Sequence, residues 1–124
     1  MFNSKKNILF VFLLTLSFVV LGVVNSFSAE GPVIYKTYCV QCHGIKGNGK
    51  GINTPFMNVQ PRDHSSAKEM QILPDSQIKK AITLGGLSVS KGVEMPPWGK
   101  ILTEKEINEL VVYLRELCNC KGAN

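Results

Sequence analysis

The stretch Cys39-Val40-Gln41-Cys42-His43 decides how this sequence is interpreted. Two cysteines with two residues between them lie about one helical turn apart, so their thiols can add to the two vinyl groups on one edge of a haem. The histidine that follows places an imidazole where it can bind the iron. The C-x-x-C-H spacing therefore predicts a covalently bound haem c, with Cys39 and Cys42 as the attachment residues and His43 as the proximal ligand.

Three other chemistries are open to the two cysteines of this motif: a disulfide, half of a zinc site and a thioredoxin-like redox pair. A structural zinc site needs four ligands, and only His64, Cys118 and Cys120 remain to complete one, at irregular spacing. A redox pair is expected beside a βαβ unit, and the sequence shows no such pattern. The spacing favours haem over all three.

The first 29 residues have the composition of an export signal. Lys5 and Lys6 are followed by 17 uncharged residues, 8–24, and then by mostly small residues up to Ala29. This order is typical of a secretory signal peptide, for which we predict residues 1–29. An uncleaved membrane anchor is the alternative, because 17 residues lie between the length of a signal core, about 7–15, and that of a membrane-spanning helix, about 20.

The remaining residues, 30–124, have the length of a single small domain. They hold 12 basic and 9 acidic residues, a net charge of +3. The leader predicts that this domain is exported to the periplasm, free or tethered to the membrane. Nucleic-acid binding is excluded by export and by a composition with only two arginines.

Apolar residues recur with helical spacing in several stretches, whereas no useful length alternates with the period of a strand. The pair Thr103 and Glu106 forms a capping box that begins the clearest helix. We therefore predict an all-α fold with helices over 103–118, 75–84 and 32–42, and a short helix near 66–71.

The glycine-rich segment after His43 resembles a phosphate-binding loop, because Gly44 is followed by Gly49-Lys50 at the required spacing. The next residue is Gly51, which lacks the hydroxyl that binds magnesium, and no predicted strand leads into the loop. We therefore exclude a nucleotide site. The glycines are expected to let the backbone turn tightly against the haem edge.

Several segments match one known family in order along the chain. They are CVQCHG (39–44), GIKGNGKG (44–51), QPRD (60–63), IKKAITLGG (78–86) and MPPWGKILTEKEINELVVYLREL (95–117). With these segments the sequence resembles a class I c-type cytochrome. The resemblance implies three to four helices and long loops around one covalent haem c, with His and Met as axial ligands. It also implies one-electron transfer between exported respiratory partners, without catalysis by the chain itself.

The resemblance places the distal ligand at Met95. Pro96 and Pro97 stiffen the loop that follows, which suits a weak thioether ligand, and Trp98 offers an N–H to a haem propionate. His64 is a rival nitrogen ligand at a position where the family usually has an apolar residue. Its alternative is a partly exposed loop residue beside Asp63.

Three further features leave alternatives open. Arg62 is predicted to bind a haem propionate, with a solvated pair to Asp63 as the alternative. Cys118 and Cys120 allow a local disulfide, unpaired surface thiols, a disulfide or complex contact with a partner, or a metal ligand pair. The lysines are expected either to steer acidic redox partners or to be ordinary solvated surface; they are Lys46, Lys50, Lys79, Lys80, Lys91 and Lys100.

Two other functions remain alternatives to a free electron carrier. The chain could be a haem subunit of a larger oxidoreductase complex, docked through the leader or through Cys118 and Cys120. It could also be a haem sensor or enzyme with an open sixth coordination site, which requires that Met95 does not bind the iron. The electron donor and acceptor are not specified by any motif.

Overall fold

The computed structural model describes residues 30–123, and the predicted leader, 1–29, lies outside the described residues. Across the described part, every regular element is a helix, which confirms the predicted all-α class. The α-helices are α2 (Glu30–Tyr38), α3 (Val40–His43), α4 (Ala67–Met70), α5 (Asp75–Leu84) and α6 (Glu104–Cys118); the 3₁₀ helices are η1 (Thr54–Phe56) and η2 (Gly86–Val89). None of these helices is long and apolar enough to cross a membrane.

Helix α6 forms as predicted and supplies much of the core. The Thr103 hydroxyl accepts a hydrogen bond from the Glu106 N–H at 3.3 Å, and the Glu106 carboxylate accepts one from the Thr103 N–H at 2.7 Å. Both halves of the capping box are therefore present. One face of the helix is buried, through Ile107, Leu110, Val111, Leu114 and Cys118, whereas Leu117 is only half-buried.

Helix α5 covers the predicted residues and ends at a glycine that the fold requires. Gly85 has a φ of +83°, a backbone conformation that disfavours residues with a Cβ. A Cβ on Gly85 would also lie only 2.9 Å from the carbonyl oxygen of Met95. This glycine therefore both ends α5 and lets the Met95 loop pack against its end.

The first predicted helix is divided in two. We expected one helix over 32–42, whereas the structure has α2 and α3, with Cys39 between them at φ −111° and ψ −30°. This φ is well beyond the usual helical value of about −63°, so the chain changes direction at Cys39. The bend has a structural reason, because it turns the thiol of Cys42 and the ring of His43 toward the central cavity described below.

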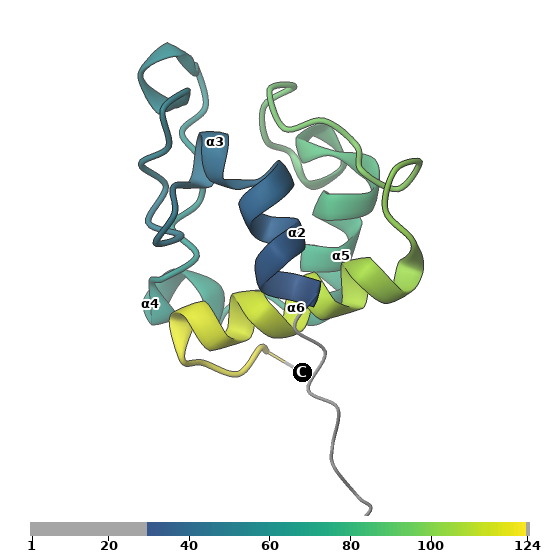
Figure 1. Ribbon diagram of the computed structural model, residues 1–124. Helices are drawn as coiled ribbons and strands as arrows, with labels where there is room; N and C mark the ends of the chain where they lie inside the picture. Colours follow the sequence, from purple (N-terminus) through teal and green to yellow (C-terminus); the bar gives the residue numbers. More distant parts are fainter. Residues whose placement is uncertain (1–29, 124) are drawn as a thin grey trace, which may run out of the picture.

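Helices α2 and α5 both pack against α6, which runs along one side of the molecule (Figure 1). The crossing of α2 and α6 is close, because a Cβ on Gly31 would lie 2.6 Å from the Glu109 carbonyl oxygen. Tyr35, one turn further along α2, is almost completely buried. The three helices together form one wall of the cavity.

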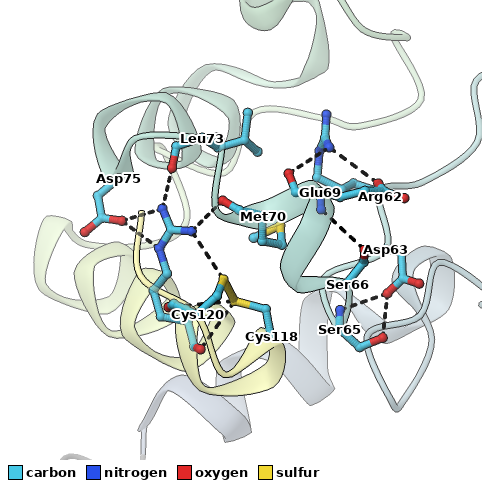
Figure 2. Close-up of a disulfide and its surroundings, with 11 residues drawn as sticks. Arg62, Asp63, Ser65, Ser66, Glu69, Met70, Leu73, Asp75, Cys118 and Cys120 are labelled. Carbon is cyan, nitrogen blue, oxygen red and sulfur yellow. Dashed lines mark hydrogen bonds and ion pairs between the residues drawn. A yellow bond between two sulfur atoms is a disulfide. The ribbon is translucent and has the colours of Figure 1, made fainter. Parts of the chain in front are cut away.

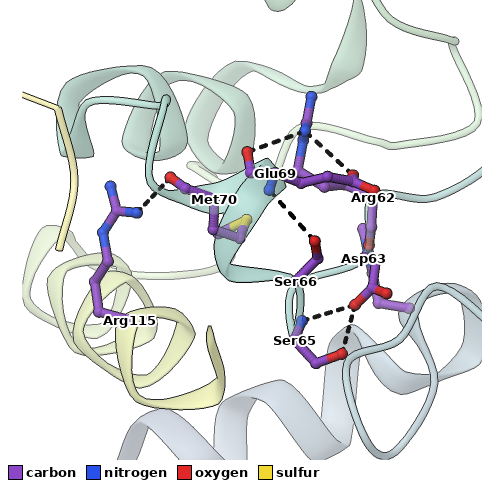
Figure 3. Close-up of polar contacts among 8 residues, drawn as sticks. Arg62, Asp63, Ser65, Ser66, Glu69, Met70 and Arg115 are labelled. Atoms are coloured by element: carbon purple, nitrogen blue, oxygen red, sulfur yellow. Dashed lines mark hydrogen bonds and ion pairs between the residues drawn. The ribbon is translucent and has the colours of Figure 1, made fainter. Parts of the chain in front are cut away.

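The end of α6 is closed by a disulfide between Cys118 and Cys120, which settles the alternatives left open for these residues in favour of the local bond (Figure 2). Next to it, the Arg115 guanidinium donates to the carbonyl oxygen of Met70 at 2.7 Å (Figures 2 and 3). It also donates to the carbonyl oxygen of Leu73 at 2.6 Å (Figure 2). It also pairs with Asp75 at 2.7 Å. Arg115 thereby ties the α4–α5 connection to α6.

Candidate functional site

A cavity of about 450 Å³ lies at the centre of the described residues. This volume is within the usual range of cofactor and ligand sites, roughly 300–1,000 Å³. Its inner wall is mainly apolar, with contributions from Met70, Leu73, Ile78, Ile82, Leu102, Leu110 and Leu114. All six site residues that the sequence predicts line this one cavity: Cys39, Cys42, His43, Arg62, Met95 and Trp98.

The short helix α3 brings the two motif cysteines together as one helical turn. The N–H groups of Cys42 and His43 both donate to the carbonyl oxygen of Cys39, at 3.2 and 2.9 Å. Both cysteines are free thiols at the cavity wall. Their spacing and free state fit attachment to one edge of a flat macrocycle.

The surroundings of the two cysteines do not complete a zinc site. Burial, with Cys42 close by, raises the pKa of the Cys39 thiol to about 12. Residues 30–123 hold no group of three or more His, Cys, Asp or Glu side chains placed to bind a metal ion. The zinc alternative therefore finds no support in the described part of the chain.

The imidazole of His43 is held in one tautomer by the backbone. Its Nδ1 lies 3.1 Å from the carbonyl oxygen of Arg62 and donates to it, which leaves Nε2 without a proton. Burial is the main reason that the pKa of His43 lies below its usual value. The lowered pKa favours the neutral ring. A neutral imidazole with its second nitrogen hydrogen-bonded to a carbonyl is the usual form of a histidine metal ligand.

His64 lies beside His43 rather than across the cavity. The two rings are stacked, with centroids 4.1 Å apart and planes inclined by 16°. Histidines on opposite faces of one iron point at each other end-on, so a face-to-face pair cannot serve as the two axial ligands. The stack gives no support to His64 as the rival sixth ligand, and the half-buried turn position agrees with the alternative of a partly exposed loop residue beside Asp63.

Arg62 lines the cavity, but its guanidinium pairs with Glu69 and not with Asp63, the partner considered from the sequence. Its guanidinium lies 3.4 Å from a carboxylate oxygen of Glu69 and 3.4 Å from the Glu69 carbonyl oxygen (Figure 3). Asp63 instead accepts hydrogen bonds from the N–H and hydroxyl of Ser65, at 2.8 and 2.6 Å. The alternative prediction of an Arg62–Asp63 pair is therefore wrong. Contact of Arg62 with a haem propionate stays a prediction.

The loop that carries Met95 and Trp98 is anchored by backbone hydrogen bonds to α5 and the residues that follow it. The N–H of Gly86 donates to the Met95 carbonyl at 3.0 Å, and the N–H of Trp98 donates to the Ile82 carbonyl at 2.9 Å. The indole ring packs on Tyr38 of α2, with ring centroids 5.2 Å apart. In Figure 1 this loop and α3 lie on different sides of α2.

Met57 and Met70 also line the cavity, so lining alone does not single out one methionine. Met70 is part of the buried core, and Met57 is on the loop after η1. That second loop contacts the Met95 loop, because the Asn58 N–H donates to the Glu94 carboxylate at 3.1 Å. Met95 differs from the other two in its rigid Pro-Pro flank and its anchors at α5.

Sequence reasoning missed Tyr35 as part of the site. No motif singled out Tyr35, whereas in the structure its hydroxyl lies 3.3 Å from Nδ1 of His64. The signal that could have found it is chemical. A tyrosine on a buried helix face needs a polar partner for its hydroxyl, and His64 is one of only two histidines in the chain.

The sequence is similar to those of known proteins. A family model described as cytochrome C oxidase, cbb3-type, subunit III, matches residues 28–114. The cytochrome c of Kluyveromyces lactis is 26% identical over 98 residues, which cover 72% of this chain and 89% of that protein.

Two solved structures have a similar fold. A chain of the Kuenenia stuttgartiensis reducing HAO-like protein complex superposes with a TM-score of 0.57 at 30% identity, over 73% of this chain and 42% of that chain. The KustC0563 c-type cytochrome superposes with a TM-score of 0.56 at 25% identity, over 70% of this chain and 95% of that chain. This chain therefore spans less than half of the HAO-like complex chain, but nearly all of the second structure.

Proposed function

The chain belongs to the family described as cytochrome C oxidase, cbb3-type, subunit III, and from that premise we propose that it carries single electrons through one haem c bound by His43 and Met95. It is a c-type cytochrome with covalently bound haem c, and its chemistry is haem-based electron transfer. When bound, the haem supplies a one-electron oxidation and reduction of its iron. We propose in addition which residues are the axial ligands, that the chain binds one haem, and that its partners are redox proteins.

One observation carries the proposal: one mainly apolar cavity is lined by Cys39, by Cys42 and His43 of α3, and by Met95 from a separately anchored loop. Cys39 and Cys42 would hold the haem by thioether bonds. His43 offers Nε2 because its Nδ1–H is bonded to the Arg62 carbonyl. Met95 offers a thioether on a loop that backbone hydrogen bonds hold at the end of α5.

Two protein ligands leave no coordination position for a substrate, so the proposed role is that of a carrier and not of an enzyme. The mainly apolar inner wall offers few groups that would reorient when the charge on the iron changes. A similar environment in both states lowers the rearrangement that accompanies each electron transfer. This is what a carrier between two redox proteins requires.

The proposed place of action is the periplasm, with the domain exported by residues 1–29. The basic and uncharged segments of that leader support this location, as does a haem attachment motif in the exported part. Its donor and acceptor are redox proteins of that compartment. The intact mass of the protein recovered from the cell decides whether the leader is removed or kept as a membrane tether.

A second candidate function is that of a haem subunit in a larger oxidoreductase. It is favoured by the solved relative that belongs to a reducing HAO-like protein complex. A complex subunit would purify with other chains at a mass well above 13.7 kDa, whereas a free carrier would purify near its own mass. Gel filtration of the protein from its native source distinguishes the two.

The experiment that tests the carrier proposal is carbon monoxide binding to the reduced protein. With His43 and Met95 both bound, the absorption spectrum should stay unchanged when carbon monoxide is added. Met95→Ala should open the site and bind carbon monoxide, whereas Met57→Leu, a matched change at the same cavity wall, should not. Binding by the unaltered protein would instead support the sensor or enzyme alternative.

A further inference from the structure

We propose that His64 is a positioning residue for the proximal ligand: stacked on His43 and held by Tyr35, it sets the rotation of the His43 imidazole plane about its bond to the iron. The inference rests on the proposed function, because it takes His43 as an iron ligand. Nothing in the sequence motif itself requires a second histidine here.

The first observation is the stack. The ring centroids of His43 and His64 are 4.1 Å apart and their planes differ by only 16°. Flat rings at this separation are in van der Waals contact over much of their faces. His43 therefore cannot turn about its Cβ–Cγ bond without pushing into the face of His64.

The second observation is that His64 is itself anchored at its backbone and at its ring. Its N–H donates to the Gly47 carbonyl oxygen at 2.6 Å. Its Nδ1 lies 3.3 Å from the hydroxyl of Tyr35, which lies 3.5 Å from the Gly44 carbonyl oxygen. One proton arrangement satisfies both contacts: His64 Nδ1–H donates to Tyr35, and Tyr35 donates to Gly44.

Tyr35 is a firm support for this arrangement. It is only 2% exposed, and its ring meets the ring of Tyr113 edge to face, with centroids 5.3 Å apart at 65°. The chain of contacts therefore runs from the packed α2–α6 interface, through Tyr35 and His64, to the face of His43. Tyr35 holds the ring of His64, and His64 in turn holds the ring of His43.

The stack adds a constraint that the hydrogen bond of His43 cannot supply. The bond from Nδ1 to the Arg62 carbonyl oxygen, at 3.1 Å, fixes one atom of the ring. A ring held at one atom can still pivot about that contact, whereas a neighbour across its face blocks the pivot. Together the carbonyl and His64 leave the imidazole one orientation.

The orientation of an axial imidazole has a direct spectroscopic consequence. The plane of the ring determines which iron d orbital holds the unpaired electron of the oxidised haem, and hence how spin is distributed over the four methyl groups of the macrocycle. Proton shifts of these methyl groups therefore report ring rotation, even when the protein remains folded and both ligands remain bound.

The test compares these methyl shifts, and the reduction potential, in the oxidised holoprotein and three variants. His64→Leu keeps apolar volume but loses the flat face and the hydrogen bond to Tyr35. The proton shifts of the four methyl groups should therefore differ from those of the parent, and the reduction potential should change. His64→Phe restores a flat face and should return the shifts most of the way to those of the parent. Tyr35→Phe frees the His64 ring and should give a smaller change in the same direction.

Lys68→Ala is the matched control, because Lys68 is exposed and lies in α4, close to His64 in the chain. Its methyl shifts should equal those of the parent. Parent-like methyl shifts in His64→Leu would overturn the inference, and parent-like shifts in Tyr35→Phe would do so if the leucine variant does not fold. An unaltered protein that lacks the sulfur-to-iron charge-transfer band of Met ligation would instead contradict the proposed function, which keeps the two failures distinct.

Discussion

The thioether of Met95 is the residue-scale feature with the largest expected effect on the iron. Met95→His replaces it with an imidazole, a stronger donor that stabilises the oxidised state, so the reduction potential should fall. A fall of about 0.1 V or more is expected, within the roughly 0.8 V over which axial ligands set haem potentials. Protein-film voltammetry measures this, with Met57→Leu as the control that leaves the potential in place.

Single residues differ in how far the sequence predicts them. Cys39, Cys42 and His43 were predictable because their geometry follows from local spacing within one helical turn. The stack of His43 on His64 was not, since the two are 21 positions apart and meet only after the glycine loop folds back. Similarly, Arg62 pairs with Glu69 on α4 and not with its sequence neighbour Asp63.

The crossing of α2 and α6 is the element-scale contact with the least room for change. A Cβ on Gly31 would lie 2.6 Å from the Glu109 carbonyl oxygen, which is far inside van der Waals contact. Gly31→Ala should therefore push the helices apart and lower the free energy of unfolding by about 1–3 kcal/mol. Thr37→Ala, at an exposed position of α2, should change it by no more than about 0.5 kcal/mol in urea denaturation.

Arg115 links three elements, and its loss should be costly. Arg115→Ala leaves the carbonyl oxygens of Met70 and Leu73 without this donor, and it also removes the pair with Asp75. We expect the free energy of unfolding to fall by about 3 kcal/mol. Arg115→Lys keeps the charge but not the forked geometry and should recover only part of the loss. Equal stability of all three proteins would contradict this role.

At the element scale the sequence predicted α5 and α6 well, because their caps and apolar periodicity are local. It failed at α2 and α3, where the apolar pattern runs through Cys39 without a break. The bend is imposed by the need to face the cavity, a tertiary requirement that no local pattern encodes. The 3₁₀ helices η1 and η2 were missed for the same reason, as short turns set by loop packing.

At the scale of the whole molecule, the net charge of +3 on residues 30–124 should steer small oxidants. Ferricyanide is an anion, so its rate of electron exchange with the reduced protein should fall as ionic strength rises, by about three- to tenfold between low and high salt. A cationic cobalt(III) complex should show the opposite trend. Stopped-flow absorption measures both, and equal slopes for the two oxidants would show that the charge has no steering effect.

The overall architecture was predictable from the resemblance to class I c-type cytochromes, which implies helices and long loops around one haem c. The 450 Å³ cavity is lined both by the C-x-x-C-H turn and by the Met95 loop. The disulfide of Cys118 and Cys120 was one of several open alternatives, since two cysteines with one residue between them can point together or apart. Only the backbone turn after α6 decides between these outcomes.

The measurement that most directly tests ligation by His43 and Met95 is the near-infrared absorption spectrum of the oxidised protein. Ligation by these two residues predicts a haem c spectrum with a weak sulfur-to-iron(III) charge-transfer band, which is lost in Met95→Ala and kept in Met57→Leu and Met70→Leu. A haem c spectrum without this band, or a band that survives in Met95→Ala, would contradict Met95 as the distal ligand and the proposed carrier function with it.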